Sequence, residues 1–165
     1  MAADIASLVA ALESPDAAAQ QRAAERLAQL ADEAQAAAVP LVEACGAQQE
    51  ALREAAVAAL ESLGSPPAGA VVPLARLLVR RELDVAYWAA TLLGRLQEEA
   101  APAVAALAQA LADHPELAVR ERAAWALGKI GPAAAPAREA LESAAASAQP
   151  RLANLAREAL KAIPK

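Results

Sequence analysis

Residues 119–131 read VRERAAWALGKIG, and weaker copies of this segment recur about every 33 residues along the chain. The copies start near residues Arg22, Arg53, Tyr87 and Asn154. A fixed period in this range is typical of a solenoid, in which each repeat packs only on its neighbours. Proteins of this class act through an extended surface. The repeat therefore predicts a binding surface rather than a catalytic pocket.

The composition favours many thin contacts between helices over one large core. Aromatic residues make up 2% of the 165 residues and Phe is absent, whereas large cores usually rely on aromatic side chains. Alanine, the strongest helix former, is abundant instead. The formal net charge is −5, and no run of Lys and Arg is longer than Arg80-Arg81. Because nucleic-acid binders usually show a basic patch, we expect no nucleic-acid partner.

Apolar spacing and helix breakers divide the chain into five helical pairs. Ile5, Leu8, Val9 and Leu12 follow the i, i+3, i+4, i+7 spacing of an amphipathic helix, and Asp16 can cap the next helix. Turns that contain Gly or Pro separate the helices, and a Pro recurs at or inside the first helix of four pairs. The expected pairs cover about 4–30, 33–63, 68–96, 100–130 and 133–163.

The recurring segments resemble HEAT repeats, and more closely the short bacterial repeats related to phycobilisome lyases. The resemblance rests on Val119-Arg120, Ala123-Ala124 and residues 127–131, and on the matching Ala89-Ala90 and residues 93–96. It implies an all-α, right-handed α-solenoid of about five HEAT-like helical pairs in a single domain, 1–165. In such arrays the second helix of each pair lines the inner, concave surface. Artificial binders built from a repeat consensus are similar too.

One side of the second helices gathers the three aromatic residues. At 100° per residue, Val119, Ala123 and Leu127 face the core, so the positions opposite them are expected to be exposed. Trp and Tyr beside Arg are typical of binding hot spots, and Arg or Lys can stack on the rings. The competing interpretation is that the tryptophans fill space against a neighbouring helix. The candidate binding residues are Tyr87, Trp88, Thr91, Arg95, Glu121, Arg122, Trp125 and Lys129.

The sequence lacks the residue patterns of an active site. Cys45 is expected to be a small buried hydrophobe, and the single histidine, His114, a solvated turn residue. No set of His, Cys and carboxylates has metal-ligand spacing, and no Gly-rich loop is suited to a phosphate. We therefore expect no catalysis, no cofactor and no metal.

The predicted function is a non-catalytic scaffold that binds a protein or peptide on the concave surface. Two alternatives stay open: a lyase-like or enzyme-associated module that handles a prosthetic group, and a designed or relict scaffold with no dedicated partner. The start of the chain lacks the basic residues of a signal peptide, and uncharged stretches are too short to span a bilayer. We expect a cytoplasmic protein that is monomeric or weakly self-associating.

Overall fold

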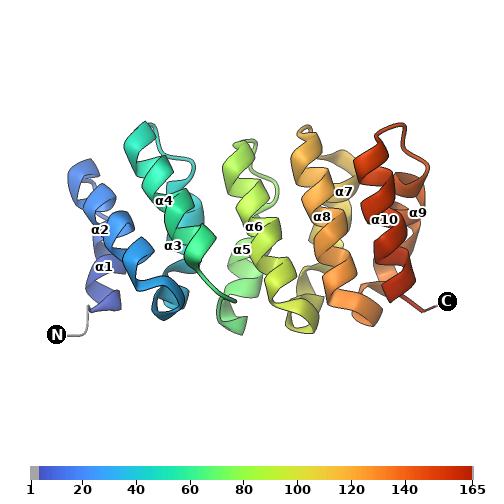
Figure 1. Ribbon diagram of the computed structural model, residues 1–165, viewed down its shortest axis with the longest axis horizontal. Helices are drawn as coiled ribbons and strands as arrows, with labels where there is room; N and C mark the ends of the chain where they lie inside the picture. Colours follow the sequence, from blue (N-terminus) through green and yellow to red (C-terminus); the bar gives the residue numbers. More distant parts are fainter. Residues whose placement is uncertain (1–3, 165) are drawn as a thin grey trace. The chain divides into compact units, whose positions relative to one another are not determined.

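The computed structural model describes residues 4–164, and over this range the chain contains helices and turns without any strand (Figure 1). The residues fall into two compact units, Met1–Pro67 and Ala68–Lys165. Each unit is a stack of helical pairs at the places that the apolar periodicity predicts. The predicted all-α fold of the α-solenoid class is therefore confirmed. The single domain over 1–165 and the right-handed sense of the superhelix stay predictions.

The first unit holds two helical pairs. Its helices are α1 (Ile5–Leu12), α2 (Ala17–Leu30), α3 (Ala38–Ala44) and α4 (Glu50–Ser62). The Asp16 side chain accepts a hydrogen bond from the Ala18 backbone N–H, so the predicted cap is confirmed. Fully buried leucines, among them Leu27 and Leu60, form the contact between the helices. Cys45 is buried, as predicted, and its Sγ donates to the Leu41 carbonyl oxygen at 3.4 Å.

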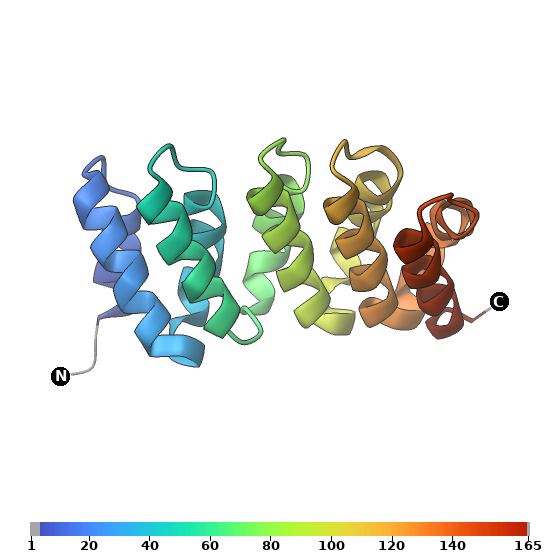
Figure 2. The same cartoon turned by 45° about the horizontal axis from the view of Figure 1, so that its top comes forward.

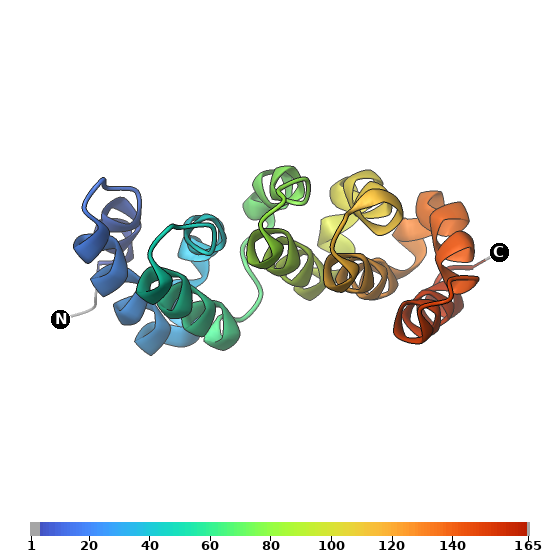
Figure 3. The same ribbon diagram turned by 90° about the horizontal axis from the view of Figure 1, so that it is seen from above.

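The second unit holds three helical pairs in two layers. Its helices are α5 (Val71–Leu77), α6 (Leu83–Arg95), α7 (Val104–Asp113), α8 (Leu117–Ile130), α9 (Arg138–Ala145) and α10 (Pro150–Ala162). The second helices α6, α8 and α10 form one layer and the first helices α5, α7 and α9 the other, which Figure 3 shows from above. Leu93, Leu107 and Leu127 are fully buried in this unit. The layer of second helices leaves one side free of the first helices.

Short 3-10 segments introduce the first helices and explain the recurrent prolines. These segments are Ala31–Ala37, Ala68–Ala70, Gln97–Ala103 and Gly131–Ala137. Pro102 and Pro136 lie inside such segments, whereas Pro40 and Pro73 lie in the first turn of α3 and α5. Backbone N–H groups in a first turn have no helical partner, so the proline costs little there. The prolines mark the starts of helices.

The turns that follow three of the second helices share a positive φ. The values are 47° at Ala31, 52° at Gln97 and 72° at Gly131. Side chains other than that of Gly rarely adopt this conformation because the Cβ atom meets the backbone. The backbone is therefore strained at Ala31 and Gln97, whereas the glycine at the equivalent position, Gly131, adopts the positive φ without strain.

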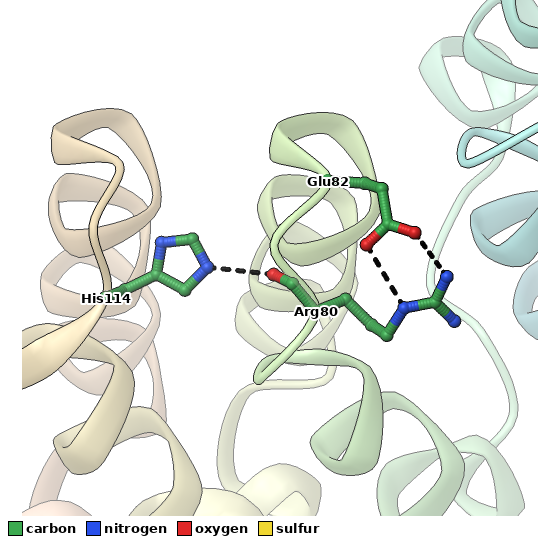
Figure 4. A network of polar contacts seen from close by, with 3 residues as sticks. All are labelled: Arg80, Glu82 and His114. Atoms are coloured by element: carbon green, nitrogen blue, oxygen red, sulfur yellow. Dashed lines mark hydrogen bonds and ion pairs between the residues drawn. The ribbon is translucent and has the colours of Figure 1, made fainter.

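His114 is buried, so the prediction of a solvated turn residue is wrong. Its side chain is 8% exposed, and its Nε2 atom lies 3.0 Å from the backbone carbonyl oxygen of Arg80 (Figure 4). Its Nδ1 atom accepts the Glu116 backbone N–H at 3.1 Å, which assigns the proton to Nε2. The imidazole thus joins the α7–α8 turn to the turn between α5 and α6. Beside it, Arg80 pairs with Glu82 at 2.5 Å and lowers the pKa of that exposed carboxyl.

Within residues 4–164, none of the helices combines the length and the apolar character needed to span a bilayer.

Candidate functional site

The free side of α6, α8 and α10 carries most of the residues that the sequence singles out. The three helices lie side by side in Figures 1 and 2, and their contacts agree. Residues 122, 125 and 129 of α8 share one side of that helix, as do residues 151, 155 and 158 of α10, because their spacing is three or four. We call this surface the α6–α8–α10 face. It comprises Tyr87, Arg95, Glu121, Arg122, Trp125, Lys129, Arg151, Leu155 and Glu158.

Arg122 lies between two aromatic rings that come from two different helices. Its guanidinium carbon is 4.6 Å from the centroid of the Tyr87 ring and 5.0 Å from that of the Trp125 ring. Its Nη2 atom also donates a hydrogen bond to the Tyr87 hydroxyl. Each cation–aromatic contact contributes about 0.5–2 kcal/mol, depending on how far it is desolvated. These contacts hold the Arg122 side chain in one position.

Trp125 rests directly on the backbone of α6, at a glycine. A Cβ atom placed on Gly94 would lie only 2.2 Å from Cζ3 of the Trp125 ring. Gly94 therefore makes room for the indole, which is half-buried between α6 and α8. The Nζ atom of Lys129 lies 5.8 Å from the centroid of the same ring. Trp125, which the sequence predicts to be exposed, is thus partly accessible and lies between Arg122 and Lys129.

Two of the predicted binding residues are buried, and their expected exposure is wrong. Trp88 is 8% exposed and Thr91 is 6% exposed. The Trp88 ring meets the Tyr87 ring edge-on at 5.9 Å, and the Arg95 guanidinium lies 5.7 Å from its centroid. The Thr91 hydroxyl donates to the Tyr87 carbonyl oxygen at 2.8 Å. For Trp88 the space-filling interpretation therefore holds, since the large ring is covered by neighbouring side chains.

Positive charge is concentrated on the second helices of this unit. Helices α6, α8 and α10 carry seven Lys and Arg residues against three Asp and Glu residues. Burial lowers the pKa of Arg95, and the nearby charge of Arg122 lowers it further. Among the residues described, no carboxylate lies within ion-pair distance of Arg122 or Lys129. These two cations face the aromatic rings and solvent.

The carboxylates on the face already have basic partners. Glu121, whose side chain is 12% exposed, lies 3.3 Å from Nε of Arg151, whose side chain is 75% exposed. Glu158 lies 2.7 Å from Nζ of Lys161, and both are exposed. Glu121 is thus offset by Arg151 of the face and Glu158 by the adjacent Lys161, so the excess charge is positive.

A furrow runs between α8 and α10. It consists of two hollows with volumes of about 140 and 320 Å³, and Trp125 and Leu155 line both of them. Gly128 lets the two helices approach, because a Cβ atom there would lie 3.1 Å from Cα of Ala159. Arg151 and Leu155 were absent from the predicted site residues. Leu155 occupies the position in its repeat that Arg122 occupies in α8, so the repeat register carries a signal for it, whereas Arg151 has none.

The face offers side chains for binding. It contains aromatic rings, cations and carboxylates, and over residues 4–164 no group of three or more His, Cys, Asp or Glu is arranged to hold a metal ion. Such a surface can hold a ligand by stacking, apolar contact and charge-assisted hydrogen bonds.

Comparison with solved structures supports the fold. An engineered protein with a crystal structure is 25% identical, with 96% of this chain and 78% of that chain covered, at a TM-score of 0.64. A designed armadillo repeat protein, solved in complex with the peptide (KR)4, is 20% identical, with 97% and 82% covered, at a TM-score of 0.70. The second likeness shows the fold alone. The comparison with curated proteins gave no match.

A family model described as HEAT repeats matches residues 72–161. The matched range holds all the residues of the α6–α8–α10 face. The match is to HEAT repeats in general and gives no support to the narrower likeness to repeats related to phycobilisome lyases. Since the model spans more than half of the chain, and the helical pairs recur as the sequence predicts, the chain belongs to the HEAT-repeat family.

Proposed function

We propose that this protein is a non-catalytic scaffold that binds a peptide segment of another protein on the α6–α8–α10 face. We take this face as the concave surface that the sequence predicts. The observation that carries the proposal is the half-buried Trp125, which is framed by Arg122 and Lys129 and borders both hollows of the furrow. Trp, Tyr and Arg are the residues most enriched at the centres of protein interfaces.

The fixed position of the cluster favours binding. A flexible Arg or Trp side chain loses about 0.5–1.5 kcal/mol of conformational freedom when an interface immobilises it. Here Arg122 is already held by Tyr87 and Trp125, and Trp125 already rests on Gly94. Most of that cost is therefore borne in folding rather than in binding. The designed armadillo repeat protein that carries the peptide (KR)4 supports the proposal, because it has a similar stack of helices.

The proposal also includes the monomeric or weakly self-associating state and the cytoplasmic location predicted from the sequence. Light scattering after size-exclusion chromatography over a range of concentrations checks the first, and imaging of a tagged chain checks the second.

The test is selection from a random-peptide display library on the immobilised protein, followed by calorimetric titration of the enriched peptides. We expect enrichment, and we expect Trp125→Ala to weaken the selected peptides by about 30-fold or more, because a central hot spot contributes about 2 kcal/mol or more. Val72→Ala is the matched control, since Val72 is a 53% exposed residue of α5 outside the face. Absence of enrichment, or equal binding to wild type and Trp125→Ala, would overturn the proposal.

A further inference from the structure

We infer that the peptide taken by the α6–α8–α10 face is acidic, with carboxylates bound at Arg122, Lys129 and Arg151 and an apolar side chain against Trp125 and Leu155. This inference rests on the proposed function and specifies its partner. It follows from the sign of the charge, the remaining donors of Arg122 and Arg151 and the dimensions of the furrow.

Arg122 and Lys129 are held in position without a carboxylate partner among the described residues. Aromatic rings orient the Arg122 guanidinium and the Lys129 ammonium, but a ring carries no net charge. Burial lowers the pKa of Arg95, and the like charge of nearby Arg122 lowers it further. Two neighbouring guanidinium groups that repel one another are relieved when an anion binds between or beside them. The face therefore has a physical reason to attract carboxylates.

The guanidinium groups of Arg122 and Arg151 also have N–H donors that can bind a ligand. A guanidinium has five N–H groups, and the Tyr87 hydroxyl is the hydrogen-bond partner of Arg122 among the described residues. Arg151 turns its Nε towards Glu121, and its side chain is 75% exposed. The remaining N–H groups of such a guanidinium can bind a carboxylate through two parallel hydrogen bonds. Arg122, Arg151 and Glu121 line the same hollow.

The furrow has the dimensions of a short extended peptide. From Ala118 to Lys129 it follows α8 for about 16 Å, at the helical rise of about 1.5 Å per residue. An extended chain advances about 3.3 Å per residue, so about five residues fit. Arg122 and Lys129 are about 10 Å apart along the helix by the same rise. Carboxylates three residues apart on an extended peptide match this spacing.

Nucleic acid is the less suitable polyanion because the rest of the chain is acidic. Residues 1–67 carry 10 Asp and Glu residues against 3 Lys and Arg residues. In residues 68–165 the counts are 10 acidic and 12 basic, so the excess of cations is local and small. A long phosphate backbone requires an extended basic surface. A short peptide with a few carboxylates requires only the α6–α8–α10 face.

The experiment uses a charge-balanced peptide display library on the full chain, with a single-stranded DNA oligonucleotide as a separate probe. We expect the enriched peptides to carry net negative charge with acidic residues three apart. For one enriched peptide, Arg122→Glu and Lys129→Glu should each weaken binding about 10-fold or more, because a repulsive contact replaces an attractive one. Arg76 is an exposed residue of α5 outside the face, so Arg76→Glu changes the net charge equally and should leave binding within twofold.

Each other outcome has a defined meaning. Enrichment of neutral or basic peptides, or equal losses for Arg76→Glu and Lys129→Glu, would overturn the acidic partner and leave peptide binding standing. DNA that binds more tightly than the best peptide would also overturn it. No enrichment of any peptide would mean that the proposed function itself fails. Circular dichroism of each variant confirms that it is folded before binding is measured.

Discussion

The contact between Gly94 and Trp125 predicts a strong dependence of one residue on the other. In Gly94→Ala, the new Cβ atom would lie 2.2 Å from Cζ3 of Trp125 and 2.8 Å from Cε3. Real Cβ atoms do not approach carbon so closely, so the indole or helix α6 must move. Overpacking of this kind typically costs about 1–3 kcal/mol of unfolding free energy. The better helix propensity of alanine returns about 1 kcal/mol or less.

The same substitution should behave differently once the ring is gone. In a Trp125→Ala background, the clash disappears and only the helix propensity remains, so Gly94→Ala should stabilise by about 0.5–1 kcal/mol. The two substitutions should therefore be coupled by about 1–3 kcal/mol, which is the cost of the clash, because the propensity gain is the same in both backgrounds and cancels. Urea unfolding of the four proteins, followed by circular dichroism at 222 nm, measures this coupling. An equal effect of Gly94→Ala in both backgrounds would refute the seating of Trp125 on α6.

Three further predictions concern the turns and the buried aromatic. Gln97→Gly should raise the free energy of unfolding by about 0.5–2 kcal/mol, because the residue has a φ of 52°, while Gly131→Ala should lower it. Urea titration measures both changes, and a lower free energy of unfolding in Gln97→Gly would contradict the backbone strain. His114→Ala should cost about 1–3 kcal/mol, because the Arg80 carbonyl and Glu116 N–H lose their shared partner; a change below the error of the same titration would contradict the bridge. Acrylamide should quench Trp88 fluorescence in a Trp125→Phe variant much less than that of free indole, and ready quenching would contradict its burial.

The helical pairs are readable in the sequence because each level of the pattern agrees. Apolar spacing, the cap at Asp16, and the breakers between helices all point to the same boundaries, and the structure has helices within a few residues of them. The prolines that recur at or inside the first helices mark 3-10 segments and first turns. Because each repeat contacts only its neighbours, packing between distant parts of the chain does little to change the helix boundaries that the local sequence predicts.

Burial of individual side chains is harder to predict because it depends on partners one repeat away. Helical spacing places Trp88 and Trp125 on similar sides of their helices, yet Trp88 is covered by Tyr87 and Arg95 while Trp125 keeps a partly open face. His114 is similar, because its hydrogen-bond acceptor is the carbonyl of Arg80, 34 residues earlier. The local sequence pattern predicts neither contact.

The candidate site likewise has one part that the sequence predicts and one part that only the packed structure shows. Tyr87, Arg122, Trp125 and Lys129 are found together because the repeat register aligns them on adjacent helices. The contribution of α10 depends on the close approach of Gly128 to Ala159, which forms the furrow and brings Arg151 to Glu121. Such an approach is a property of packed backbones, so the sequence pattern of one helix does not contain it.

The central claim is that Trp125 lies in a peptide-binding surface, and the indole N–H signals of the protein test it most directly. The chain has two tryptophans, so a ¹H–¹⁵N spectrum contains two such signals, and Trp125→Phe assigns them. On titration with an enriched acidic peptide, we expect the Trp125 signal to shift in step with binding while the Trp88 signal stays in place. Binding of the peptide with no shift at Trp125 would contradict the account.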